Sequence, residues 1–239
     1  NIGKYLNDFQ FKTLINPFGI MYNPVSIFNS LDRIVHKKLY TEDDLLLHHE
    51  LYISLDHHGD FSSTHKLEVL NHINSNIEQA HAFYKASKYL IITLGTSLVY
   101  KHIEQNKVVA NCHKIPNTAF QKLFLSVDEI VKDFNKIAAF LQDKKIVFTV
   151  SPVRHWRDGA VENQRSKSIL IESIHQIMAQ NNNCFYFPAY EIMMDELRDY
   201  RFYAEDMIHP NTVAVKYIWQ KFSETYFSEH TSKINKRIE

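Results

Sequence analysis

The sequence predicts an α/β fold in which amphipathic helices cover both faces of a mostly parallel sheet. Two continuous apolar runs, at residues 89–94 and 145–150, are typical of strands that are buried on both faces. The segments between such runs carry apolar residues three or four positions apart, which is typical of helices that pack by one face. Strands that alternate with crossover helices pair in parallel. We therefore expect residues 90–94 and 146–150 to be neighbouring parallel strands in a three-layer α/β/α arrangement.

Composition limits the class of protein and its partners. With 239 residues, 45% of them hydrophobic, the chain can fill one large core, and we expect a single domain over residues 1–239. Lys+Arg and Asp+Glu balance at 27 each, so no overall field attracts a nucleic acid or an anionic membrane. No apolar run approaches the roughly 20 residues that a membrane span needs. Cys112 and Cys184 are far apart, which predicts a reducing, cytoplasmic compartment.

The first quarter of the chain gives shorter signals. Residues 2–6 have helical spacing, and residues 9–15 alternate like a strand. Residues 16–19, Asn-Pro-Phe-Gly, break this strand and predict a loop at its carboxyl end. Asn23 and Pro24 predict the start of a helix that continues to about residue 34. Residues 36–63 hold two short apolar runs, 45–47 and 50–55, with a turn at 57–60, which predicts an inserted hairpin.

The remaining elements follow from helical spacing and capping signals. Residues 64–84 predict a long helix, and the Ser126–Glu129 capping box predicts the start of another. A helix around residues 169–178 precedes a short strand at 184–187. The last helix is predicted from about Pro210 to Phe227.

Polar loops follow the predicted strands, and they would meet at one edge of the sheet. They are residues 16–19, 95–97 and 151–155, together with the segment that leads to Asp206 and His209. Ordinary turn chemistry also places Gly and Pro after strands. In parallel sheets, however, ligands bind beyond the carboxyl ends of the strands. The shared edge therefore favours a functional site.

Asp206 and His209 are the strongest catalytic candidates. A carboxylate three residues before a histidine, on a loop that ends at Pro210, can hold the imidazole in one tautomer while its other nitrogen faces a substrate. The alternative is that both residues cap the helix that follows, since Asp and Pro are common at helix starts. We interpret the pair as a general base and its orienting acid.

Several other residues have both a functional and a structural interpretation. Cys112 and His113 place a thiol beside an imidazole, but sequence neighbours need not meet in space and buried thiols are usually inert. Arg154, His155 and Arg157 are candidates to bind an anionic substrate group, or else form a solvated loop. Residues 200–203 either wall an acyl or sugar pocket or pack to fix the loop.

The histidine pairs predict no metal site. His48 with His49 and His57 with His58 invite a zinc interpretation, because imidazole is a common zinc ligand. Neighbouring residues of a strand point to opposite faces of a sheet, so a pair does not readily reach one ion. We expect neither a metal nor an organic cofactor.

Several spaced segments together resemble one family. They are residues 16–20 with 22–24, 94–96, 111–114, 151–155, and 201–203 with 206–210. They resemble the GSCFA domain and, through it, the SGNH (GDSL-like) hydrolases, which implies a flavodoxin-like sheet. The Gly-Ser-Cys-Phe-Ala motif that names the family normally lies just before a segment like residues 1–4. This chain lacks the motif, so we expect the domain to be incomplete at its N-terminus.

The resemblance also implies roles for individual residues. His209 matches the family's base and Asp206 its orienting acid, while Gly19 and Gly95 match glycines that line the oxyanion site. Ser97 stands where the family has a donor asparagine, and a serine hydroxyl can also donate. The nucleophile would be a serine or a cysteine upstream of Asn1.

The leading functional hypothesis is an acyl-ester hydrolase or acyltransferase that acts on a small-molecule or glycan ester. The first alternative is a non-catalytic binding domain on the same scaffold, because a fold does not establish activity and Ser97 replaces the family's donor asparagine. A metal-dependent phosphoesterase is the weakest hypothesis, because the sequence has no dense carboxylate–histidine motif.

Overall fold

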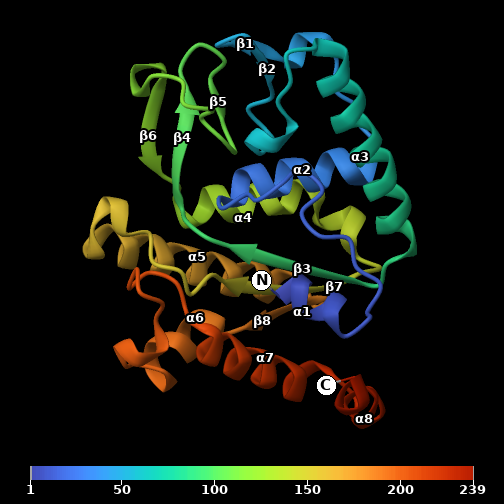
Figure 1. Cartoon of the computed structure of the whole chain (residues 1–239), viewed down its shortest axis with the longest axis vertical. Helices are drawn as coiled ribbons and strands as arrows, with labels where there is room; N and C mark the ends of the chain where they lie inside the picture. Colours follow the sequence, from blue (N-terminus) through green and yellow to red (C-terminus); the bar gives the residue numbers. More distant parts are fainter. Residues whose placement is uncertain (1, 239) are drawn as a thin grey trace.

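A three-stranded parallel sheet lies at the centre of the computed structural model, which describes residues 2–238 (Figure 1). Its strands, in spatial order, are β3 (Tyr89–Leu94), β7 (Lys145–Val150) and β8 (Cys184–Phe187). β3 and β7 pair in parallel with Ile92 opposite Phe148, and these two side chains are only 5% and 0% exposed. The prediction that residues 90–94 and 146–150 are neighbouring parallel strands is confirmed. Burial on both faces holds for β7 only, because in residues 2–238 β3 is an edge strand of this sheet, with Tyr89 and Thr93 exposed.

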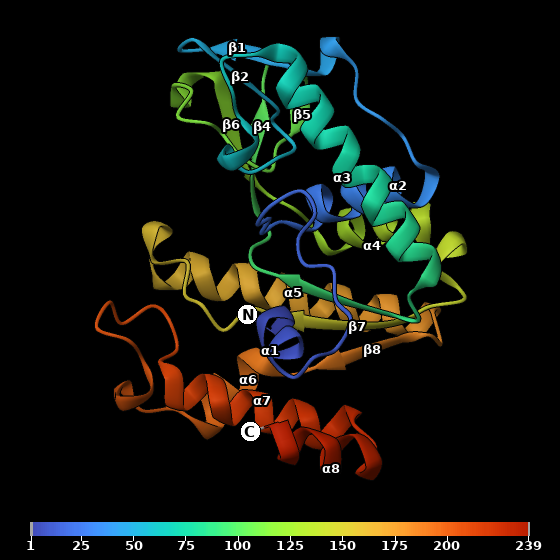
Figure 2. The same cartoon turned by 45° about the vertical axis from the view of Figure 1, so that its right-hand side comes forward.

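Helices cover both faces of this sheet, as the alternation of elements predicted (Figure 2). On one face lie α4 (Val127–Ala138) and α5 (Ala160–Gln180), with α2 (Pro24–His36) packed against α4. On the other face lie α1 (Ile2–Asp8) and α7 (Thr212–Tyr226). The short α6 (Ala189–Glu191) follows β8, and α8 (Glu229–Ile238) follows α7. No helix in residues 2–238 combines the length and the apolar character needed to cross a membrane.

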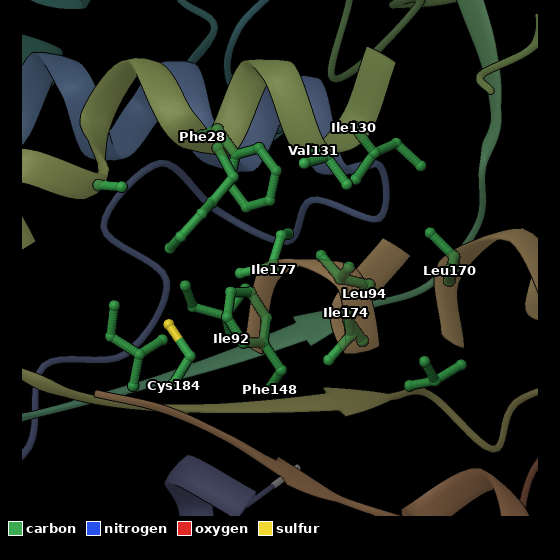
Figure 3. Close-up of a cluster of buried hydrophobic side chains, with 14 of the residues drawn as sticks. Phe28, Ile92, Leu94, Ile130, Val131, Phe148, Leu170, Ile174, Ile177 and Cys184 are labelled. Carbon is green, nitrogen blue, oxygen red and sulfur yellow. The ribbon is translucent and has the colours of Figure 1, made fainter. Parts of the chain in front are cut away.

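Aromatic rings fill the space between the sheet and α4. Phe134 on α4 contacts both Phe28 and Phe148, with ring centroids 5.4 Å apart in each pair. Figure 3 shows Phe28 from α2, Ile177 from α5 and Phe148 from the sheet converging on this core, with the Cys184 thiol beside them. Edge-on ring contacts of this kind add to the free energy gained by burying the rings. This cluster fixes α4 and α5 on the sheet.

Two helices begin where their capping residues predicted. The Asn23 side chain accepts a hydrogen bond from the N–H of Ser26 at 2.9 Å, and α2 begins at Pro24. Ser126 and Glu129 form the predicted capping box, in which each side chain accepts from the other residue's N–H. These reciprocal bonds satisfy donors that the first turn of a helix leaves free.

Two antiparallel sheets lie apart from the parallel sheet, in the upper part of Figure 1. The first is the predicted hairpin, formed by β1 (Leu46–His48) and β2 (Leu51–Ile53) and followed by α3 (Lys66–Ala86). The second contains β5 (Lys107–Val108), β4 (Leu98–His102) and β6 (Phe120–Phe124) in that spatial order. The sequence pattern does not predict this second sheet, because its strands are short and carry several polar residues. The prediction of a mostly parallel sheet therefore holds for the central sheet only.

The prediction of a strand over residues 9–15 is wrong, since the chain there is irregular. The alternating aromatic residues pack on α7 and the segment after it instead of on a sheet face. Phe9 stacks on Trp219 with centroids 5.4 Å apart, and Phe11 stacks on Phe227 at 5.1 Å. Gln10 between them has a φ of +61°, which is incompatible with a strand. Consequently residues 16–19 do not follow a strand end.

We expect Phe148→Ala to lower the free energy of unfolding by about 3–5 kcal/mol, because it removes a fully buried ring from a close-packed core. Urea denaturation followed by circular dichroism would measure the change. Phe140→Ala is the matched control, since Phe140 is 51% exposed and its loss should cost much less. Equal losses for the two variants would contradict the assignment of Phe148 to the core.

Candidate functional site

The carboxyl ends of the three parallel strands lie at one edge of the sheet, towards the left of Figure 1. There the loop after β7 meets the loop before α7. The N–H of Arg154 donates to the carbonyl of Ile208 at 3.3 Å, and its Nη1 donates to the carbonyl of Met207 at 3.3 Å. The structure therefore brings together two of the loops that the sequence predicted at this edge.

A tight loop carries Asp206 and His209. Tyr203 and Pro210 form an antiparallel bridge that closes the loop, and the N–H of Ala204 donates to the carbonyl of His209 at 2.7 Å. Met207 at the tip has a φ of +58°, the left-handed conformation that such a reversal requires. This short closed loop places the two candidate side chains beside each other.

Asp206 holds His209 through both of its carboxylate oxygens. Oδ2 lies 2.6 Å from Nδ1 of His209, while Oδ1 accepts the N–H groups of Ile208 and His209, each at 2.9 Å. The N–H of His209, then its ring, then the N–H of Ile208 lower the pKa of Asp206 to about 2. The carboxylate thus stays charged at any ordinary pH. The His209 side chain is 60% exposed, and Nε2 is the ring nitrogen left to meet a ligand.

The two residues do not cap the helix that follows. Asn211 takes this role, because its side chain accepts the N–H groups of Val213 and Ala214 at 3.1 Å each. α7 therefore begins at Thr212, two residues later than the sequence suggested. Helix capping, the structural alternative for Asp206 and His209, therefore does not explain the contact between their side chains.

The backbone donors expected at the oxyanion site are engaged within the protein. The N–H of Gly95 donates to the carbonyl of Tyr22 at 2.7 Å, and that of Gly19 donates to the carbonyl of Asn16 at 2.8 Å. Gly19, with a φ of +83°, packs so closely on His58 that an added Cβ would lie 2.3 Å from its Cβ. Glycine is thus required at residue 19 for close packing. In this structure neither N–H is free to bind a ligand.

Ser97 is also turned inward. It is fully buried, its N–H donates to Oγ of Ser166 at 2.8 Å, and its hydroxyl lies 3.3 Å from the same oxygen. Thr96 contacts Ser166 as well, with the two hydroxyl oxygens 3.0 Å apart. Ser97 therefore ties β3 to α5 and does not reach the surface.

Arg154 and His155 line the same edge in different surroundings. The guanidinium carbon of Arg154 lies 4.1 Å from the ring centroid of Tyr203, and the residue borders a cleft of about 290 Å³ that Asp206 also lines. His155 is half-buried and meets Tyr22 edge-on, with centroids 5.8 Å apart. Burial, and then the charge of Lys167, lower the pKa of His155. A neutral His155 is therefore favoured.

The thiol–imidazole pair of residues 112 and 113 does not form a nucleophile site. His113 directs Nε2 at the carbonyl of Ser54, 2.8 Å away, and burial raises the pKa of Cys112. Of the four histidines in residues 48–58, His57 is buried against Phe18, with ring centroids 4.6 Å apart. Within residues 2–238 no group of three or more His, Cys, Asp or Glu is placed to hold a metal ion.

Lys167 is an internal residue of this edge that the sequence interpretation missed. It is fully buried on α5, and its Nζ donates to the carbonyls of Gly95 and Ser151 at 2.7 Å each. Burial lowers the pKa of Lys167 to about 7. A signal was present: Lys167 lies three residues before Leu170 and seven before Ile174, within the apolar stripe of its helix. A lysine in such a stripe is unusual enough to mark a buried polar contact.

These features define an α/β domain with an exposed Asp–His pair at the carboxyl edge of a parallel sheet. A model of the GSCFA family matches residues 1–222, which is nearly the whole chain. The chain therefore belongs to the GSCFA family. No curated protein and no solved structure matches it.

We expect the difference in free energy of unfolding between wild type and Lys167→Met to change by about 2 kcal/mol in favour of wild type between pH 7 and pH 9. The pKa of Lys167 is about 7 in the folded chain and near 10.5 when exposed, so in this range the unfolded chain holds a proton that the folded chain lacks. Raising the pH therefore favours folding. Urea denaturation at both pH values tests this, with the exposed Lys145→Met as control. A constant difference between wild type and Lys167→Met would contradict the titration of Lys167.

Proposed function

We propose that this chain forms the acid–base part of an acyl-ester hydrolase or acyltransferase, with His209 as general base and Asp206 as its orienting acid. The observation that carries the proposal is the 2.6 Å contact between Oδ2 of Asp206 and Nδ1 of His209. Two further hydrogen bonds fix the same carboxylate, so the imidazole is held in one tautomer and orientation. The exposed ring can meet a substrate without a movement of the fold.

In the proposed reaction, Nε2 of His209 takes the proton from a serine hydroxyl or a cysteine thiol as that group attacks the acyl carbon. The bond between the acyl carbon and the alcohol oxygen then breaks, and His209 returns the proton to the leaving alcohol. Water or a second alcohol next attacks the acyl-enzyme and gives its proton to His209. The nucleophile then leaves the acyl carbon and recovers that proton. Asp206 stays ionised and stabilises the imidazolium at each step.

The nucleophile in this proposal is a serine or cysteine that precedes residue 1 in the intact polypeptide. The support is the family membership together with the resemblance of the residue 206–210 segment to the base-bearing segment of SGNH hydrolases. We extend the proposal to the SGNH superfamily and its flavodoxin-like layout. The parallel order of β3, β7 and β8, with helices on both faces, is compatible with it.

The proposed substrate is a small-molecule or glycan acyl ester, and the proposed reaction uses neither a metal nor an organic cofactor. Nucleic-acid and membrane partners form no part of the proposal. The proposed location is the cytoplasm. Balanced charge supports leaving out nucleic-acid and membrane partners, and the absence of a cysteine framework supports the cytoplasm.

A second candidate is a non-catalytic binding domain on the same scaffold. It is favoured by one observation, that the N–H groups of Gly19 and Gly95 already have backbone partners. Acyl transfer needs donors aimed at the oxyanion, and a binding domain does not.

We expect His209→Ala to lower kcat on short acyl esters by at least about 10²-fold, the contribution typical of a general base. The assay requires a protein that carries the family's Gly-Ser-Cys-Phe-Ala segment before residue 1. His230→Ala is the control, since His230 is an exposed histidine on α8. Turnover equal to that of the control would remove His209 from the mechanism.

We also expect residues 1–239 alone to lack esterase activity, because Ser97 is buried and burial disfavours the Cys112 thiolate. Addition of the upstream segment should then restore turnover, and replacement of its serine or its cysteine by alanine should identify the nucleophile. Rapid ester hydrolysis by residues 1–239, lost in Cys112→Ala, would place the nucleophile within the chain instead.

A further inference from the structure

Three aromatic rings surround the guanidinium of Arg154 beside the Asp206–His209 pair. Its central carbon lies 4.1 Å from the ring centroid of Tyr203, 5.4 Å from that of Tyr200 and 5.5 Å from that of Trp156. Tyr200 is 62% exposed and Trp156 is 50% exposed. Large aromatic side chains left open at a cleft are suited to contact the apolar face of a ring-shaped ligand. Tyr203, by contrast, is buried, and its ring is the nearest of the three to the guanidinium.

Arg154 differs from the other arginines that lie over rings. Arg33, Arg165 and Arg201 each pair with a carboxylate, whereas Arg154 has no ion pair with an Asp or Glu in residues 2–238. Its Nη1 donates to the carbonyl of Met207 at 3.3 Å, and its side chain also hydrogen-bonds the uncharged side chain of Tyr203. A guanidinium has five N–H donors in a planar fork that matches a carboxylate or a phosphate. Held in place by aromatic rings and lacking a counter-ion, Arg154 is suited to receive an anionic group.

The cleft between these side chains has a size and charge that restrict the ligand. It measures about 290 Å³ and is lined by Arg154, Trp156, Tyr200, Asp206, Met207 and Ile208. This volume lies at the small end of the range for ligand sites, which suits one ring with one substituent. Asp206 repels a second anionic group and can accept hydrogen bonds from hydroxyls. A ring that carries one anionic group and several hydroxyl groups fits these constraints.

We propose that this cleft binds an anionic sugar, with its carboxylate or phosphate on Arg154 and its ring against Trp156 and Tyr200. The inference rests on the proposed function for one point only, that an acyl group on this sugar would be the one presented to His209. Binding of the sugar itself needs no nucleophile and no turnover, so it is tested separately.

The test is isothermal titration calorimetry of the full-length protein with sugars that carry no acyl group. We expect glucuronate or glucose 6-phosphate to bind about 10- to 100-fold more tightly than glucose, the gain from a charge-assisted hydrogen bond. The two anionic sugars distinguish a carboxylate from a phosphate. Acetate and inorganic phosphate, which lack the ring, should bind more weakly than the matching sugar.

Variants then assign the two parts of the site. Arg154→Gln should abolish the preference for the anionic sugar, and Arg154→Lys should restore part of it by restoring the charge. Trp156→Ala should weaken glucose and the anionic sugars alike. Arg165→Gln is the matched control, because Arg165 also lies over a ring, that of Phe124, but is paired with Glu162. Thermal melting of each variant establishes that the fold is intact.

Several outcomes would overturn the assignment. Equal binding of glucose and the anionic sugars, or a preference that survives in Arg154→Gln, would remove Arg154 as the anion site. If free phosphate or acetate binds as tightly as the sugars, or a nucleoside monophosphate binds more tightly, an anionic sugar is ruled out as the ligand of this cleft. If anionic sugars bind as expected but no ester is turned over, the proposed function fails and this inference stands. If His209-dependent turnover occurs without an anion preference, this inference fails alone.

Discussion

The two hydrogen bonds from the buried amino group of Lys167 to the carbonyls of Gly95 and Ser151 hold together the edge on which the site is built. Where β3 and β7 leave the sheet, their carbonyls lose the ladder partners that neighbouring strands supply. A buried carbonyl without a donor costs free energy, and Lys167 supplies both missing donors from α5. Because the same helix carries Ser166, which binds Ser97, one turn of α5 fixes both strand ends. The positions of the loops that follow depend on this connection.

The catalytic candidates lie one step outside that fixed edge. Arg154 extends from the loop after β7 and bonds to Met207 and Ile208, while Asn211 bonds to the carbonyl of Arg201 at 2.6 Å. The loop of Asp206 and His209 is thus held from two sides by polar contacts with few buried apolar groups. Exposed loops that a rigid scaffold positions in this way are common at binding sites. Buried hydrogen bonds from α5 therefore fix the strand ends, whereas polar contacts near the surface fix the loop of Asp206 and His209.

Sequence patterns predicted the parts of the fold that local physics determines. The parallel strands at 89–94 and 145–150, and the helices capped by Asn23 and Ser126, follow from apolar spacing and capping. The spacing of Asp206 and His209 likewise predicted a contact that the loop then forms. The strand prediction for residues 9–15 failed because their alternating pattern fits aromatic packing on α7 and the segment after it as well as it fits a sheet. Strands over residues 98–124 were missed because their pairing is set by tertiary contacts. The same holds for the partners of Gly95 and Ser97, which lie on distant segments.

Because the N–H groups of Gly19 and Gly95 already have backbone partners, the proposed chemistry needs other hydrogen-bond donors for the oxyanion. Gly19 and Gly95 use their N–H groups to hold the chain in shape, and Ser97 uses its polar groups to join β3 to α5. Stabilisation of an oxyanion would then come from side chains at the rim, or from residues outside 2–238. Oxyanion donors are effective because they are fixed before the reaction and aimed at the developing charge. In residues 2–238 the structure shows such fixation for Asp206 and His209, whose contact is supported by two further bonds. The chain thus positions the imidazole of His209, and the rest of the proposed reaction depends on what approaches that side chain.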